Sequence, residues 1–331
     1  MQPRLPSFPL LELDGRGFTA HHVLAAADLR GELAPALDQL AARLAVVQEV
    51  DTPSLQRALD GFRTARALTA VDDFKSWLSA RDLGLGDVAD FLERQLARPG
   101  EARREDGAAV YGELVCRGLL DRWMLALGRR LAVHAQWLEG GRSEPAPDAL
   151  PRMPTATAFV GEGLEASELQ RLAEAEAVYA TLEARLLVDT RLQRVLEARK
   201  LELVAFDLEV FGTPSADVAR ELRLCLKVDG LGIEELTRRS GLPLREVHAF
   251  AEALPRVVQR ELLAAVPGEV LGPFVVEGEH QVLRLRRKAL PSLARPEVRA
   301  RLEAEARSGA FGDALHERVR WPRWRPAGGA A

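Results

Sequence analysis

Residues 262–291 read LLAAVPGEVLGPFVVEGEHQVLRLRRKALP, and this stretch decides the fold of the second half of the chain. An apolar helical run ends at a Pro-Gly pair, and two short apolar runs follow at 272–276 and 281–285. A Glu-Gly-Glu sequence lies between these two runs and has the composition of a hairpin turn. The stretch therefore predicts a helix followed by two antiparallel strands.

A third strand is expected upstream, at residues 201–211, which read LELVAFDLEVF. Aliphatic, aromatic and β-branched residues crowd together there and stop at a Gly-Thr-Pro turn. Helices are expected at 215–228, 233–239 and 254–266, and residues 240–250 are expected to run straight towards the third of them. The order strand, helices, strand, turn, strand predicts a small α+β unit with an antiparallel-rich sheet. Because strands and helices do not alternate as a βαβ series, a nucleotide-binding Rossmann sheet is not expected.

Helices flank this unit on both sides. Residues 166–196 alternate Glu and Arg over a leucine stripe, which predicts one long charged helix, and residues 296–318 predict a final helix. Residues 139–155 are rich in Gly and Pro and poor in apolar residues, so they are expected to form a linker.

The first half of the chain is expected to be helical. Between residues 21 and 138, apolar residues recur at three- and four-residue spacing, as in Leu33, Leu37 and Leu40. The last helix of this half is expected to run unbroken from about 110 to 138. Together, the two halves predict an α+β protein that is mostly α.

Composition narrows the classes of function. The chain has 331 residues, 47% of them hydrophobic, and a formal net charge of -4, so no global charge attracts it to nucleic acid. No uncharged apolar run approaches the length of a membrane span, and the N-terminal residues lack the apolar core of a signal peptide. These features predict a soluble, cytoplasmic protein. Cys116 and Cys225 have no partner at metal-ligand spacing and are expected to be small buried apolar residues.

Two further motifs have competing interpretations. His21 and His22 are adjacent on an expected helix, where neighbouring side chains do not converge on one ion, so no metal site is expected. The tail at 320–326, RWPRWRP, has an Arg and Trp pairing that suits stacking on bases or clamping of a peptide. The alternative, which we favour, is that one Trp docks into the helical half.

The stretch at 262–291 resembles the closing segment of parvulin (PpiC-type) prolyl isomerases. That segment consists of a helix, a Pro-Gly-Glu-Val turn, a Gly-Pro-apolar strand, a second turn and a strand that opens with histidine. The corresponding residues here are 267–270, 272–274 and His280. Upstream, VAFDLEV at 204–210 matches the position of the family's first strand. The helical half is similar to the peptide-chaperone domain that precedes parvulin domains in SurA-type proteins.

This resemblance implies a domain order, with the C-terminal helix returning to pack on the N-terminal helices. The expected domains are a helical peptide-chaperone-like domain at 1–138, a linker at 139–155, a connecting helix at 156–200, a parvulin-like domain at 201–291, and the returning helix and tail at 292–331.

The resemblance also implies a peptide-binding site with a degenerate catalytic centre. Active parvulins have two facing histidines and a pocket, largely of Met and Phe, that takes the proline ring. Here Asp207 occupies the first histidine position, and His280 matches the second. The family's glycine-rich stretch is absent, and the expected pocket is aliphatic. The implied peptide-binding residues are Asp207, Leu254, Val258, Leu262, Phe274 and His280, of which Asp207 and His280 are the catalytic candidates if the domain is active.

A degenerate isomerase domain beside a chaperone-like domain is similar to accessory proteins of ribosomal-peptide natural-product pathways. The resemblance implies a non-catalytic, cofactor-free protein that binds an extended precursor peptide and presents it to modifying enzymes. One alternative is an active prolyl isomerase or foldase, and another is a scaffold for a biosynthetic enzyme complex. A homodimer stays open because exposed strand edges are expected.

Overall fold

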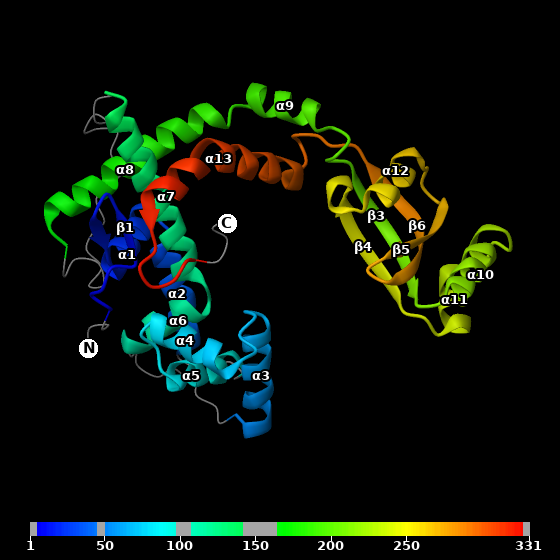
Figure 1. Ribbon diagram of the computed structural model, residues 1–331, viewed down its shortest axis with the longest axis horizontal. Coiled ribbons are helices and arrows are strands. Elements are labelled where there is room, and N and C mark those ends of the chain that lie inside the picture. Colours follow the sequence, from blue (N-terminus) through cyan, green and yellow to red (C-terminus); the bar gives the residue numbers. More distant parts are fainter. Residues whose placement is uncertain (1–4, 45–49, 97–106, 142–163, 327–331) are drawn as a thin grey trace. The chain divides into compact units, whose positions relative to one another are not determined.

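The computed structural model describes residues 5–44, 50–96, 107–141 and 164–326 (Figure 1). It is mostly helical, with small antiparallel sheets, which confirms the expected α+β, mostly α class. Contacts divide the chain into two compact units, unit 1 at 1–185 together with 309–331, and unit 2 at 186–308. Most of the expected linker at 139–155 lies outside the described residues.

Unit 1 is built mainly from helices. Its elements are β1 (Leu11–Leu13), β2 (Arg16–Phe18), α1 (Ala20–Leu29), α2 (Leu33–Leu44), α3 (Thr52–Thr64), α4 (Val71–Ala80), α5 (Leu85–Leu96), α6 (Gly107–Cys116), α7 (Leu119–Glu139), α8 (Ala166–Leu186) and β7 (Val319–Arg320). The three strands form a small sheet in the order β2-β1-β7. The sequence did not predict this sheet, because strands of two or three residues are too short to show a period.

Two long helices expected from the sequence are each broken. The one expected at 110–138 divides into α6 and α7 at Gly118, whose φ of 70° lies in the left-handed region that favours glycine. The one expected at 166–196 divides into α8 and α9 (Asp189–Ala198), where Val188 is extended and caps α9. In both cases the apolar spacing continues across the break, so periodicity alone did not reveal it.

The C-terminal tail returns to unit 1 through one tryptophan. Trp324 is buried, and its Nε1 donates a hydrogen bond to Oδ1 of Asp121 at 2.8 Å. The Arg81 guanidinium lies 4.6 Å from the Trp324 ring centroid and pairs with Asp121 at 3.6 Å. The expectation that one Trp docks into the helical half is therefore confirmed.

Unit 2 contains a four-stranded antiparallel sheet. Its elements after α9 are β3 (Ala205–Thr213), α10 (Ala216–Lys227), α11 (Ile233–Ser240), β4 (Leu244–Phe250), a short 3-10 turn η2 (Ala251–Ala253), α12 (Arg256–Ala264), β5 (Val270–Val276), β6 (Glu279–Ala289) and α13 (Pro296–Arg318), whose last residues belong to unit 1. The strand order is β4-β3-β6-β5. The expectation that residues 240–250 run straight to a helix is wrong, because β4 pairs with β3 along its whole length.

The two faces of this sheet are covered by different helices. Because successive side chains of a strand point to opposite faces, Leu208 and Val210 face α12, whereas Phe211 faces α10 and α11. Val258 and Leu262 complete the core on the first face, which we call the α12 face. The second face is called the α10 face.

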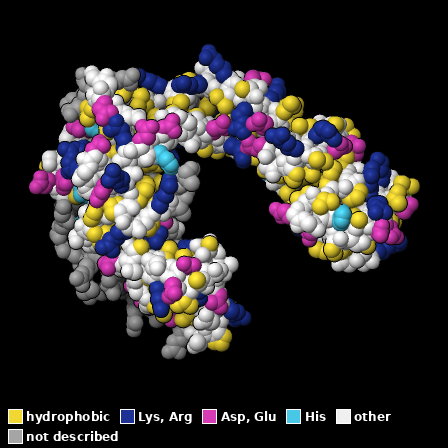
Figure 2. Space-filling model, viewed as in Figure 1, with side chains coloured by type: hydrophobic (Ala, Val, Ile, Leu, Met, Phe, Trp, Pro, Cys, Tyr) yellow, Lys and Arg dark blue, Asp and Glu magenta, His cyan; other side chains and the backbone are white. Residues whose placement is uncertain are grey.

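Helices α9 and the start of α13 pack together beside this sheet. Their buried contacts join Leu192 and Leu196 to Val298 and Leu302. Charged side chains crowd along this part of the molecule in the space-filling view (Figure 2). Arg199 pairs with the carboxylates of Glu202, Glu252 and Glu305. None of the helices within the described residues combines the length and apolar character that crossing a bilayer requires.

Candidate functional site

An open aliphatic groove crosses the α12 face of the sheet in unit 2. Its volume is about 590 Å³, and all four strands contribute to it. The lining residues are Leu208, Val210, Arg245, Val247, Ala253, Leu254, Pro255, Val258, Val275, Val276, Glu277, Gln281 and Leu283. This volume falls within the range of sites that bind small molecules or short peptide segments.

Four of the six residues expected to bind peptide lie at or beneath this groove. Leu254 and Val258 line it; Leu254 is extended and lies just before α12, and Val258 lies in the first turn of that helix. Leu262, one turn further along the helix, is fully buried against the sheet and supports the groove without lining it. Phe274 is partly buried and packs against the same core. The structure therefore brings these four aliphatic and aromatic side chains together on one face.

Val275 marks the outer border of the groove. It lies on the outer strand β5 and is 69% exposed, which is high for a large hydrophobic side chain. Figure 2 shows hydrophobic side chains exposed over the sheet unit. Because Val275 lies opposite His280, strand alternation directs its side chain to the α10 face, whereas the neighbouring Val276 packs on the α12 face.

A salt bridge lies across one end of the groove floor. Arg245 on β4 and Glu279 on β6 pair at 2.9 Å over the intervening strand β3, directly above Gly212. A Cβ at Gly212 would lie 2.6 Å from both charged groups, so a side chain there would displace the ends of Arg245 and Glu279. Glu277 also borders the groove, and no ion pair involves it within the described part of the chain. The groove is thus apolar in its middle and charged at this end.

Asp207 and His280, the two catalytic candidates, are not brought together. Asp207 pairs with Arg287 on β6, whereas His280 pairs with Thr213, six residues further along β3. At about 3.3 Å per residue, this separates them by roughly 20 Å. Neither residue lines the groove, and strand alternation directs both towards the α10 face.

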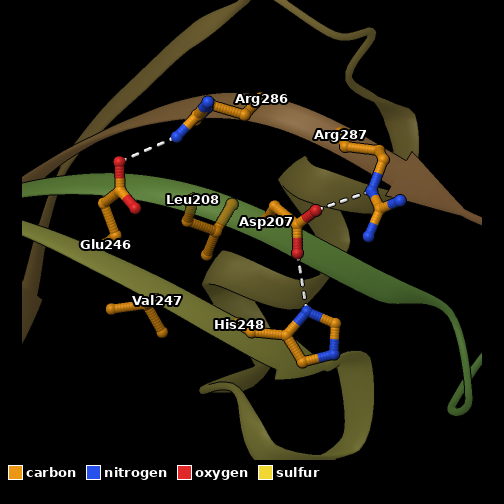
Figure 3. Close-up of a pocket in the computed structure, with 7 residues that line it drawn as sticks. All are labelled: Asp207, Leu208, Glu246, Val247, His248, Arg286 and Arg287. Carbon is orange, nitrogen blue, oxygen red and sulfur yellow. Dashed lines mark hydrogen bonds and ion pairs between the residues drawn. The ribbon is translucent and has the colours of Figure 1, made fainter.

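Asp207 instead belongs to an ionic cluster on the α10 face (Figure 3). Its Oδ1 lies 2.6 Å from Nδ1 of His248 on β4, and its Oδ2 accepts a hydrogen bond from Nε of Arg287 at 2.6 Å. The hydrogen bond with His248, aided by Arg287, lowers the pKa of Asp207 below its ordinary value although partial burial opposes this. Both acidic oxygens are therefore occupied in the folded chain.

The same cluster continues along the strands with two further carboxylates. Glu209, whose side chain is almost fully buried, accepts a hydrogen bond from Nε of Arg284 at 2.6 Å. Glu246 on β4 pairs with Arg286 at 2.7 Å. A shallow pocket of about 580 Å³ lies over Asp207, Glu246 and His248. Because each of its carboxylates already has a basic partner, the cluster mainly fixes the strands relative to one another.

The other histidines and cysteines that the sequence singles out can be placed within the described residues. No group of three or more His, Cys, Asp or Glu within the described ranges is arranged to hold a metal ion. His22 instead contacts Thr19 at the start of α1 and Glu168 of α8. Burial raises the pKa of the Cys116 thiol to about 12, so this cysteine is a poor nucleophile. Cys225 is partly exposed and borders a separate pocket between α10 and α11.

The sequence interpretation missed the residues that β4 contributes. Arg245 and Val247 line the groove, and His248 contacts Asp207. The segment LREVHAF carries only a weak strand signal. Apolar and charged residues alternate imperfectly in it, because Arg245 and Glu246 are adjacent. The absence of a turn signal before η2 concealed the strand. No family model matches the sequence, and a search of curated proteins finds no match.

Proposed function

We propose that this protein binds an extended peptide in the aliphatic groove on the α12 face. The observation that carries the proposal is an open groove of about 590 Å³ that is lined by aliphatic side chains from all four strands and from α12. Its partly exposed Leu254 and Val276 offer apolar contacts to the side chains of a ligand. The resemblance of residues 262–291 to parvulins supports the same surface.

The ligand we propose is a ribosomally made precursor peptide that the protein presents to modifying enzymes. An extended chain suits a groove that crosses the strands, because side-chain contacts can recur along it. Binding without turnover is favoured over prolyl isomerisation, since Asp207 and His280 lie roughly 20 Å apart along the strands and outside the groove. The scaffold hypothesis requires enzyme binding in the absence of any peptide.

Calorimetric titration with precursor-derived peptides tests the proposal. Leu254→Arg places a charge in the groove, and we expect it to weaken binding at least tenfold. Val257→Arg is the matched control three residues further along the chain, because Val257 is 59% exposed and does not line the groove. Equal affinity of the Leu254→Arg variant and the parent would contradict the proposed site.

A prolyl-isomerisation assay separates the alternatives. We expect no acceleration of cis–trans exchange in an X-Pro peptide, at protein concentrations that saturate binding. Acceleration that is lost in Asp207→Ala or His280→Ala variants would favour the active isomerase. Binding of modifying enzymes that persists without peptide, together with flat peptide titrations, would favour the scaffold.

A further inference from the structure

The two edges of the unit 2 sheet differ in their ability to accept another strand. Strand β4 pairs with β3 through seven consecutive residues without a register shift, and no described element pairs with its other edge. Strand β5 is interrupted, because its register with β6 shifts between Leu271 and Phe274, and Pro273 has no N–H to donate. A regular, unpaired edge is a template for strand addition, and only β4 provides one among the described strands of this sheet.

The backbone groups that β4 directs outward can be assigned. The N–H of Ala251 donates to the carbonyl of Val204 at 2.8 Å. Ala251 and Val204 are therefore a hydrogen-bonded pair that directly adjoins the ladder between β4 and β3. Bonded and non-bonded pairs alternate in an antiparallel ladder, so Val247 bonds to β3, whereas Glu246 and His248 direct their N–H and C=O groups outward.

The outward edge of β4 is complementary to itself. If a second copy pairs with it antiparallel about Val247, all seven residues overlap, and Glu246 of each copy lies opposite His248 of the other. Leu244 then faces Phe250, Arg245 faces Ala249, and Val247 faces its own counterpart. No like charges are opposed, and the outward-directed groups of the two strands are in phase for hydrogen bonding.

We infer that two copies of this chain pair through β4 and join their grooves into one trough. Arg245 and Val247 on β4 line the groove, so the groove reaches this edge. An antiparallel pair of this kind has its twofold axis normal to the sheet, which keeps both α12 faces on the same side. Eight strands at about 4.8 Å spacing span roughly 38 Å, which matches about 11 residues of extended peptide. The claim that the trough binds a ligand rests on the proposed function, whereas the claim that two copies pair through β4 does not.

Sedimentation velocity and disulfide trapping test the pairing. We expect the parent chain to be dimeric and Glu246→Pro to be a folded monomer, because Glu246 directs its N–H outward and its side chain is exposed. Val247→Cys, in a Cys225→Ser background, should form a covalent dimer on oxidation, since directly opposed non-bonded residues have Cα atoms about 4.5 Å apart. Ala249→Cys is the control, because it faces Arg245 and should not cross-link.

If the Glu246→Pro variant fails to fold, the two cysteine variants still test whether two copies pair through β4. A parent chain that stays monomeric, or cross-linking that is equal at positions 247 and 249, would overturn the inference.

Peptide length separates this inference from the proposed function. A peptide of about six residues fills one groove and should bind the parent and the Glu246→Pro variant equally. A peptide of about 11 residues should bind the parent at least tenfold more tightly than it binds the Glu246→Pro variant. If the short peptide binds and the parent is monomeric, only the pairing is wrong. If neither peptide binds a trapped dimer, the pairing stands and the proposed function is wrong.

Discussion

Replacing Leu262 by alanine should destabilise unit 2 without unfolding unit 1. Leu262 is fully buried where α12 packs on Leu208 and Leu285 of the sheet. The substitution removes three carbons, worth about 0.8 kcal/mol each, or about 2.4 kcal/mol in transfer free energy. The cavity left behind adds to this, so we expect the free energy of unfolding of unit 2 to fall by roughly 3 to 4 kcal/mol.

The distribution of tryptophan allows the two units to be followed separately. All five tryptophans of the chain lie in unit 1, at Trp77, Trp123, Trp137, Trp321 and Trp324. Tryptophan fluorescence therefore reports the urea unfolding of unit 1, whereas far-UV circular dichroism reports both units. With an m-value of about 1.5 kcal/mol/M, the transition of unit 2 should move down by about 2 M urea, and the fluorescence transition should stay in place.

A matched control defines the result that would refute this reasoning. Val257→Ala on the same helix changes a side chain that is 59% exposed, so we expect a loss below about 0.5 kcal/mol. If Leu262→Ala costs no more than Val257→Ala, α12 does not pack on the sheet as described. If the fluorescence transition moves by the same amount as the dichroism transition, the two units do not unfold independently.

Three further predictions concern single contacts. Asp207→Asn removes a carboxylate whose pKa is lowered mainly by the His248 hydrogen bond, so the parent should be more stable than the variant by about 0.5 kcal/mol at neutral pH. Urea unfolding at several pH values should show this difference fading as the pH drops below about 4, where the carboxylate becomes protonated. Gly118→Ala places a side chain at a φ of 70° and should cost about 1 kcal/mol, measured by the fluorescence transition of unit 1; no loss would contradict the left-handed break between α6 and α7. Trp324→Ala should lower the stability of unit 1 by roughly 3 kcal/mol and leave unit 2 unchanged, because the ring is buried against Arg81; an unchanged transition would mean that the tail is not docked.

The hairpin of unit 2 was predictable because its pattern is local. Two apolar runs joined by Glu277-Gly278-Glu279 predict paired strands, and the structure has β5 and β6 at these positions. Strand β4 was not predictable in the same way. Its apolar residues have imperfect alternation, and its stability comes from pairing with β3, which is distant in sequence.

The candidate site was predictable in part, for a similar reason. Val258 and Leu262 recur at helical spacing, so their common face follows from the sequence once α12 is expected, whereas Leu254 is extended and lies just before the helix. The separation of Asp207 from His280 depends on the register between β3 and β6, including the shift next to Asp207. Register is set by the three-dimensional pairing of strands, and the alignment that suggested two facing groups contains no information about it.

The interruption of β5 at Pro273 also bears on how far this sheet can grow. Linear polymerisation through strands requires each molecule to carry two edges that accept a neighbour, so that every addition leaves a new end. A molecule with one receptive edge and one edge broken by proline cannot propagate such a chain. The register shift and the proline in β5 therefore act together against the concentration-driven fibres that threaten many open sheets.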